Sequence, residues 1–193
     1  LTFVSAFAST AIAEGFNPTA VVNIGSLYEP QNLDNTAGAG QGINEAFNGN
    51  VYEGLFVLTD SGDVEPKLID GYEISEDRLT YTFTLKEGVS FHSGDPLTAA
   101  DVKSSIERVT AENSASSRKR TLAVIESVET PDDKTVVITL NTPSISLPYN
   151  LSYVWIVNDE AGDISARADG TGPYTLQEWR RGSALAMVPF EGS

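Results

Sequence analysis

Few residues in this chain could support catalysis. It contains a single histidine, His92, and no cysteine, so disulfides, thiolate metal sites and cysteine nucleophiles are excluded. His92 stands beside Ser93 and Asp95, which together are the residue types of a serine hydrolase triad. However, the sequence lacks the Gly-x-Ser-x-Gly motif that presents the nucleophilic serine in many such enzymes. We therefore interpret His92 as a surface residue in a turn.

The acidic residues are numerous but do not single out a site. The chain has 27 Asp and Glu residues against 12 Lys and Arg residues, a formal net charge of -15. Paired carboxylates could hydrolyse glycosides, so a secreted carboxylate-based hydrolase stays open as an alternative function. Asp163 and Asp169 lack the spacing of an EF-hand calcium loop. We expect no metal site and no cofactor, and no nucleic-acid partner, because no basic patch is present to neutralise phosphates.

A glycine-rich segment at residues 25–42 is the best candidate for contact with a ligand. It is long and has no hydrophobic periodicity, and such loops often carry function. It contains neither a phosphate-binding P-loop motif nor a G-x-G-x-x-G motif, so a nucleotide site is not expected. The small residues at 37–40 would let a ligand approach the backbone closely. A mobile surface loop is the alternative interpretation.

The stretch at residues 81–108, YTFTLKEGVSFHSGDPLTAADVKSSIER, predicts a strand, a turn and a helix. Apolar and polar residues alternate over residues 81–86, which is typical of a half-buried strand. The sequence Ser-Gly-Asp-Pro at 93–96 favours a chain reversal. Thr98, followed three residues later by Asp101, resembles a capping box, so Thr98 is the predicted N-cap of a helix.

The remaining pattern predicts short elements on both sides of this stretch. Before it we expect a buried first strand at 20–24, a helix at 43–55 and an antiparallel meander over 56–91. After it we expect a hairpin of 124–129 with 135–140, a short helix or turn at 143–151, a buried strand at 154–157, and final strands at 174–179 and 185–187. Trp155 is expected to pack in the core.

The bulk composition indicates a folded protein with one core. The chain has 193 residues, 40% of them hydrophobic and 20% charged, which is typical of an ordinary folded domain. Residues 1–13 are apolar or small and end in Ala-Ile-Ala. They predict the tail of a secretory signal peptide, with a buried first helix as the alternative. The run is too short to span a bilayer, which needs about 20 residues.

Three stretches resemble, in the same order, the extracytoplasmic solute-binding proteins of the peptide/nickel class that serve ABC importers. They are NVYEGLFVLTDSGDVEPKLIDGYEIS at 50–75, the stretch at 81–108, and GTGPYTLQEWRRGSALAM at 170–187. The resemblance covers nearly all of residues 21–187, and family members are considerably longer. We therefore interpret residues 1–13 as a signal-peptide remnant and 14–193 as the amino-terminal part of lobe I, with a β-rich subdomain at about 45–170.

This resemblance implies a fold and a function. The expected fold class is mixed α/β: a periplasmic-binding-protein-like lobe with a mixed sheet, a small antiparallel β-rich subdomain and no second lobe. The implied function is capture of an oligopeptide or dipeptide in the periplasm, or outside the membrane of a Gram-positive cell, and delivery to the permease of an ABC importer, without catalysis. Within the family, an oligosaccharide or a nickel complex stays open as the solute.

The resemblance also implies particular residues for ligand binding. The segment after Leu33-Asp34 would pair its main chain with the ligand, which gives this role to Gly38, Ala39, Gly40 and Gln41. Ser104 matches a position where some members present a larger residue to the cleft. The Gly-Thr-Gly-Pro-Tyr element would be a structural join near the cleft. A fragment of this kind would expose apolar surface and strand edges, especially at 185–188, and we expect weak solute binding and self-association.

Overall fold

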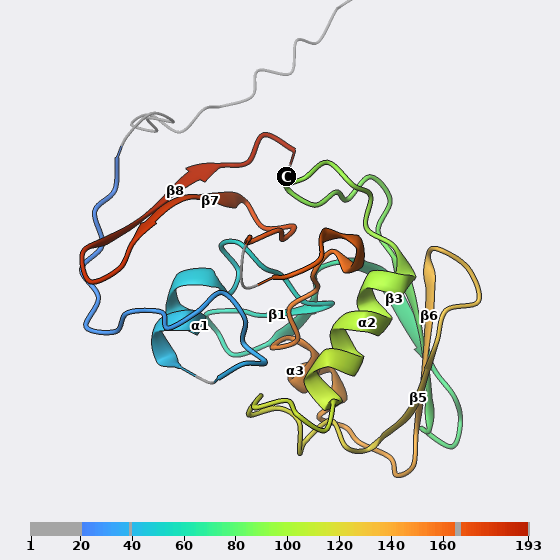
Figure 1. Ribbon diagram of the computed structural model, residues 1–193. Coiled ribbons are helices and arrows are strands. Elements are labelled where there is room, and N and C mark those ends of the chain that lie inside the picture. Colours follow the sequence, from blue (N-terminus) through green and yellow to red (C-terminus); the bar gives the residue numbers. More distant parts are fainter. Residues whose placement is uncertain (1–20, 39, 165–166, 193) are drawn as a thin grey trace, which may run out of the picture.

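The structure, a computed structural model, describes residues 21–38, 40–164 and 167–192 (Figure 1). The helices are α1 (Gln41–Phe47), α2 (Ala99–Thr110), α3 (Leu147–Leu151) and a short 3-10 helix η1 (Asp159–Ala161). The strands are β1 (Phe56–Leu58), β2 (Val64–Pro66), β3 (Ile69–Ile74), β4 (Thr80–Leu85), β5 (Ile125–Glu129), β6 (Thr135–Leu140), β7 (Tyr174–Arg180) and β8 (Ala184–Pro189). The expected mixed α/β content is confirmed.

The largest sheet has four antiparallel strands in the order β3-β4-β6-β5. Its register places Tyr81 opposite Ile138 and Phe83 opposite Val136, and all four side chains are buried. This is the apolar face that the alternation over residues 81–86 predicted, and α2 packs against it beside β6 (Figure 1). The hairpin of β5 with β6 and the short helix α3 are confirmed as well. The meander predicted over 56–91 is confirmed only in part, because β1 pairs with β2 and β3 with β4, but β2 and β3 belong to different sheets.

Helix α2 begins where the sequence predicted. Thr98 is the N-cap, and the Asp101 carboxylate accepts hydrogen bonds from the Thr98 backbone N–H at 2.9 Å and from its hydroxyl at 2.6 Å. The helix buries one stripe against the sheet, formed by Val102, Ile106 and Val109. The opposite side of the helix is therefore free to present polar residues, among them Ser104 and Arg108.

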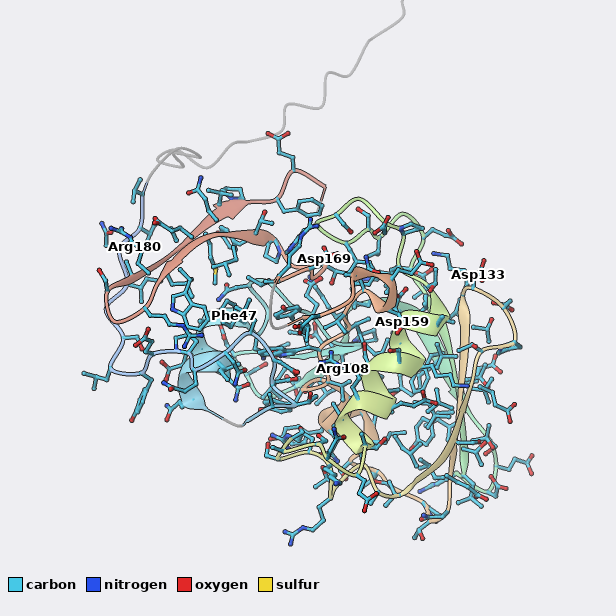
Figure 2. All side chains as sticks on the ribbon, viewed as in Figure 1. Phe47, Arg108, Asp133, Asp159, Asp169 and Arg180 are labelled. Atoms are coloured by element: carbon cyan, nitrogen blue, oxygen red, sulfur yellow. The ribbon has the colours of Figure 1, made fainter. Side chains whose placement is uncertain are left out.

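Two hydrophobic clusters fill the interior. The larger one lies between the four-stranded sheet, α2 and α3. The smaller one joins α1 to the buried segment at 154–157, and its buried members are Leu33, Ile43, Phe47, Val51, Tyr52, Trp155 and Val157. Figure 2 shows Phe47 on the α1 side of the molecule, with Arg108, Asp159 and Asp169 nearer its middle. Residues of the β7-β8 hairpin cover part of the smaller cluster, on the side of the molecule away from the large sheet (Figure 1).

The expected mixed sheet is not found. In the described part of the chain, every ladder between named strands is antiparallel. The predicted buried strand at 20–24 does not form over its described residues: Val21, Val22 and Ile24 are 84%, 77% and 86% exposed. A parallel pair needs a partner strand reached by a long crossover, and no strand in the described part of the chain pairs with residues 21–24.

Two further elements differ from the prediction. The helix predicted over 43–55 ends at Phe47, because Asn48 adopts an extended conformation and Gly49 has a φ of 75°. The predicted strand at 154–157 is buried but forms no ladder. Its backbone is satisfied singly instead: Ile156 N–H donates to the carbonyl of Glu53 at 2.9 Å, and Val157 N–H donates to the Ser105 hydroxyl at 3.0 Å.

The Gly-Thr-Gly segment at 170–172 is held from two sides. On one side Gly172 N–H donates to the Val51 carbonyl at 3.0 Å. On the other, His92 N–H donates to the Gly170 carbonyl at 2.9 Å, and the His92 ring bonds through Nε2 to the Gly172 carbonyl at 2.8 Å. His92 lies in the predicted turn, but it is half-buried rather than on the surface, and it fastens this segment to the rest of the fold.

Some expectations lie outside the described residues. The predicted signal-peptide remnant at 1–13 is one of them, and Ala39 is another. Among the helices that are described, none has the length and apolar character needed to cross a membrane.

Candidate functional site

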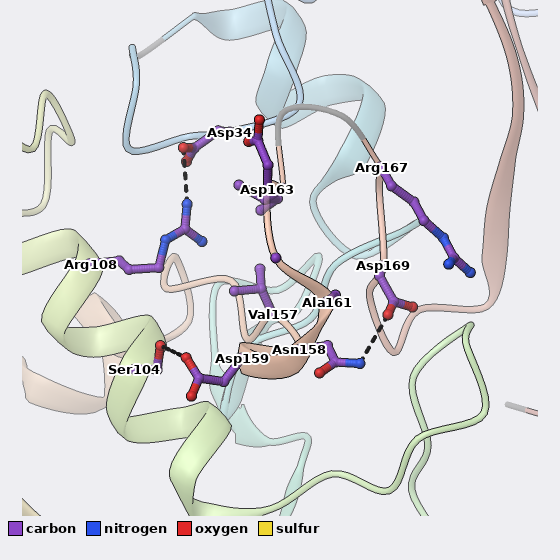
Figure 3. A pocket seen from close by; sticks show the side chains of 12 residues that line it. Asp34, Ser104, Arg108, Val157, Asn158, Asp159, Ala161, Asp163, Arg167 and Asp169 are labelled. Carbon is purple, nitrogen blue, oxygen red and sulfur yellow. Dashed lines mark hydrogen bonds and ion pairs between the residues drawn. The ribbon is translucent and has the colours of Figure 1, made fainter.

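A polar hollow of about 270 Å³ lies between α2, the loop that contains Asp34, and the segment that follows the buried stretch 154–157 (Figure 3). Its walls combine four carboxylates and two guanidinium groups with hydroxyl, amide and apolar side chains. The lining residues are Asp34, Ser104, Arg108, Val157, Asn158, Asp159, Ala161, Gly162, Asp163, Ile164, Arg167 and Asp169. Because segments distant in the sequence meet here, the hollow exists only in the folded chain.

One wall is the polar face of α2. Ser104 and Arg108 are four residues apart on this helix, so they lie one turn apart on the same face. Arg108 Nη2 forms an ion pair with Asp34 Oδ2 at 2.9 Å. The other carboxylate oxygen of Asp34 accepts hydrogen bonds from the Thr36 N–H at 2.8 Å and the Thr36 hydroxyl at 2.7 Å. Thr36 thus holds the carboxylate that holds the guanidinium.

The opposite wall is a hydrogen-bonded network around Asn158. Its Nδ2 donates to Asp95 Oδ2 at 2.8 Å and to Asp169 Oδ2 at 3.1 Å. Asp169 is buried, and its other oxygen accepts from the Ser93 N–H at 2.9 Å. Figure 3 shows Asn158 and Asp169 facing one another, while the Arg167 side chain points away from Arg108. These hydrogen bonds hold the side chains of Asp95, Asn158 and Asp169 in fixed positions along this wall.

The 3-10 helix η1 connects the two walls. The Ser104 hydroxyl donates to Asp159 Oδ1 (Figure 3), and the Asp159 N–H donates to Asp101 Oδ1 at 2.9 Å. Asp101 therefore links the N-terminus of α2 to the loop that lines the hollow.

The ion pair of Asp34 with Arg108 also borders a second hollow. That space, of about 390 Å³, is lined by Asp34, Thr36, Ala37, Arg108, Ala111, Asn113 and Ser114. The ion pair therefore lies at the boundary between two neighbouring spaces that are open to a ligand.

A buried hydroxyl lies behind the same wall. The Tyr52 side chain is fully buried, its ring stacks on Trp155 with centroids 4.7 Å apart, and its hydroxyl has no hydrogen-bond partner among the described residues. Burial raises the pKa of this hydroxyl well above its ordinary value. The nearby charges of Asp34 and Asp169 raise it further, while that of Arg108 lowers it.

The structure brings only part of the predicted ligand-binding set to the hollow. Ser104 lines it directly. Gly38 and Gly40 are half-buried, whereas Gln41 is exposed and its side-chain amide donates to Glu45 at 2.9 Å. None of these three residues is among the residues that line either hollow. The segment just before them contributes Thr36 and Ala37 to the second hollow.

Sequence reasoning missed the residues that make up most of the site. Arg108 could have been found, because it follows Ser104 at a spacing of four on a helix that was predicted correctly. Asp34 was noted only as part of a Leu-Asp pair and Asp169 only as an acid without EF-hand spacing, and Asn158 was not singled out. Their pairing depends on how the loops cross, which no local pattern records.

The arrangement does not support acid-base catalysis. His92, the chain's single histidine, accepts from the Gly170 N–H at 3.4 Å through Nδ1 and bonds to the Gly172 carbonyl through Nε2. Both ring nitrogens are thus engaged with main chain, which leaves neither for a serine nucleophile. Among the described residues, no group of three or more His, Cys, Asp or Glu side chains could hold a metal ion. What the hollow offers is a set of fixed donors and acceptors.

Replacing Asp101 with alanine should destabilise the protein by about 2 kcal/mol, because a buried carboxylate that accepts three hydrogen bonds is lost together with its helix cap. Urea denaturation followed by circular dichroism measures the change. Glu107→Gln, at an exposed acid on the same helix, is the control and should change stability by less than about 0.5 kcal/mol. Equal effects of the two variants would contradict the linking role of Asp101.

The raised pKa of Tyr52 predicts a loss of stability in alkali. Below about pH 10 the phenol is neutral in both states. Above that value the unfolded phenol ionises while the buried one does not, so the free energy of unfolding falls as the pH rises, by up to about 1.4 kcal/mol per pH unit from this residue alone. Tyr52→Phe should remove that part of the slope. Parallel stability curves for the two proteins between pH 9 and 11 would contradict the prediction.

Comparison with known proteins decides the family. A family model described as "Bacterial extracellular solute-binding proteins, family 5 Middle" matches residues 63–192. The chain belongs to this family. Family 5 is a family of solute-binding proteins and not of enzymes, which agrees with the expectation that the chain is non-catalytic and removes the support for a hydrolase.

Curated relatives match over most of the chain. The glutathione-binding protein GsiB of Pectobacterium atrosepticum is 31% identical over 180 residues, which cover 90% of this chain and 34% of that protein. The probable D,D-dipeptide-binding periplasmic protein DdpA of Escherichia coli K12 is 32% identical over 143 residues, which cover 67% of this chain and 27% of that protein. The chain therefore spans about a third, 34%, of the length of GsiB.

Solved structures of binding proteins share the fold. The binding protein AgaA from A. tumefaciens R10, in complex with agropinic acid, superposes with a TM-score of 0.78 at 32% identity, over 85% of this chain and 34% of AgaA. The oligopeptide-binding protein AppA from Bacillus subtilis, in complex with a nonapeptide, gives the same TM-score of 0.78 at 22% identity, over 86% of this chain and 36% of AppA. The chain thus has the fold of about one third of a periplasmic binding protein.

Proposed function

We propose that this protein captures a small solute outside the cytoplasmic membrane and delivers it to the permease of an ABC importer. Membership of family 5 supports this function, and the relatives GsiB and DdpA are named for solute binding, DdpA as a periplasmic protein. The observation that carries the proposal to this chain is the hollow between α2 and the loop that contains Asp34. Its polar lining includes side chains held in place by an ion pair and by hydrogen bonds, which suits a binding surface.

An oligopeptide or dipeptide is the solute that we propose. The segment at 38–41 supports it, since Gly38 and Gly40 are half-buried and, within the described chain, their N–H groups have no hydrogen-bond partner. A peptide main chain could pair with such groups and gain affinity that does not depend on its side chains. The dipeptide named for DdpA also supports this class.

The solute that accompanies the protein when it is purified from its natural source tests the proposal. Mass spectrometry of the denatured protein should release a peptide or a similar small solute in stoichiometric amount. A thermal-shift series should then show that this solute raises the melting temperature, because a ligand that binds only the folded state stabilises it. An oligosaccharide and the nickel-histidine complex serve as comparison solutes. If no solute is recovered and none raises the melting temperature, the proposed function is wrong.

A further inference from the structure

The guanidinium of Arg108 carries unused hydrogen-bond donors at the boundary between the two hollows. An arginine side chain carries five N–H donors, and the pair with Asp34 engages Nη2. No other partner of this guanidinium is found in the described part of the chain. Its side chain is 29% exposed, so the free edge can be reached from both neighbouring hollows.

The carboxylates of the walls, by contrast, already accept hydrogen bonds. Asp34 is bound by Thr36 and Arg108. Asp159 accepts from Ser104, and Asp169 accepts from Asn158 and from the Ser93 N–H. Beside Arg108 the wall therefore offers a solute free hydrogen-bond donors, whereas its carboxylate oxygens already accept hydrogen bonds. A solute group that accepts hydrogen bonds suits this surface better than one that donates them.

From these observations we infer that Arg108 binds a carboxylate of the solute through its free edge, with Asp34 as the residue that positions the guanidinium. The inference rests on the proposed function and adds to it a chemical requirement: the solute carries a carboxylate that is recognised in this hollow. A guanidinium whose orientation is fixed by one carboxylate presents its remaining N–H groups in a planar fork, and this geometry matches a second carboxylate.

The inference is tested with acid and amide forms of one probe. The protein, expressed from its natural gene, is titrated by calorimetry with trialanine, trialanine amide, glutathione and maltotriose. The wild type should bind at least one carboxylate-bearing probe, and trialanine should bind at least tenfold more tightly than its amide. Arg108→Gln should weaken binding of the acid by about ten- to a hundredfold, the effect of losing a charged hydrogen bond, and should bind acid and amide alike.

Matched variants separate recognition from folding. Arg120→Gln removes the same charge at an exposed arginine and should leave the acid-to-amide ratio unchanged. Arg108→Gln leaves the Asp34 carboxylate without its ion-pair partner, which could destabilise the fold. The double variant Asp34→Asn with Arg108→Gln replaces the ion pair with neutral groups and should melt near the wild-type temperature. Arg108→Lys keeps the charge but lacks the fork, and should retain only part of the preference for the acid.

Each outcome bears on the inference. If Arg108→Gln keeps the wild-type preference for the acid, or if the wild type binds the amide as tightly as the acid, Arg108 does not recognise a carboxylate. Binding of maltotriose alone overturns the inference and leaves the proposed capture of a solute standing. Failure to bind any probe, with no solute recovered from the natural source, overturns both.

Discussion

Replacing Gly170 with alanine is expected to lower the free energy of unfolding by about 4 kcal/mol or more, and to leave little folded protein at 37 °C. A Cβ at this position would lie 1.9 Å from the Val51 carbonyl oxygen and 2.9 Å from Cδ1 of Tyr52. The first contact is with backbone, which cannot rotate away as a side chain could. The segment would have to separate from residues 50–51, and with it would go the hydrogen bond from Gly172 N–H to the Val51 carbonyl.

The measurement is urea denaturation followed by far-ultraviolet circular dichroism, with the soluble yield recorded for each variant. Gly71→Ala is the matched control, because a Cβ at Gly71 in β3 meets nothing within 4 Å, and its effect should stay within about 1 kcal/mol. Gly172→Ala should resemble Gly170→Ala, since its Cβ would lie 2.4 Å from the Asn50 carbonyl oxygen. A Gly170→Ala protein as stable as Gly71→Ala would show that this close approach is not required.

The Gly-Thr-Gly segment affects the hollow as well as the core. Asp169, directly before Gly170, holds Asn158 and the Ser93 N–H. Thr171 donates to the buried Glu53 carboxylate at 2.9 Å, and Glu53 forms an ion pair with Lys67 at 3.0 Å. One short segment thus fixes a wall of the hollow and the Glu53 carboxylate, whose ion-pair partner Lys67 is half-exposed. The two glycines are needed because the backbone, and not a side chain, makes the contact.

Local patterns predicted the local elements of the fold. The alternation over residues 81–86 and the pair Thr98 and Asp101 located β4 and the start of α2, because strand faces and helix caps depend on neighbours within a few residues. The prediction was wrong where hydrogen bonds to residues distant in the sequence determine the local structure. The segment at 154–157 is apolar enough for a strand, but its backbone bonds to Glu53 and Ser105 instead of to a ladder.

The candidate site was less predictable for the same reason. Ser104 was proposed from a family resemblance, and it does line the hollow. The ion pair of Arg108 with Asp34, in contrast, joins α2 to the loop that contains Asp34, and the position of that loop depends on the packing of Leu33 in the smaller cluster. A chain with many acidic residues offers many partners for an arginine, so its sequence alone does not select Asp34.

Replacing Trp155 with alanine is expected to cost about 3–5 kcal/mol of stability, the range for removing a buried tryptophan. Trp155 is 3% exposed. Its ring stacks on Tyr52 and meets Phe47 edge-on with centroids 6.4 Å apart, and its Nε1 donates to Asn48 Oδ1 at 2.9 Å. The large cavity left behind would adjoin Tyr52 and Val157 in the smaller cluster. Urea denaturation of the variant measures the loss.

Two controls show whether packing or the hydrogen bond accounts for the effect of Trp155. Trp155→Phe keeps a ring on Tyr52 but loses the bond to Asn48, and should cost only about 1–2 kcal/mol. Trp179→Ala, at the half-buried tryptophan of β7, should cost less than Trp155→Ala because part of that ring is already in water. Since Val157 lines the hollow and Tyr52 lies behind it, the alanine variant should also bind solute more weakly. A loss of stability confined to about 1 kcal/mol in Trp155→Ala would mean that the smaller cluster does not hold α1 to the wall of the hollow.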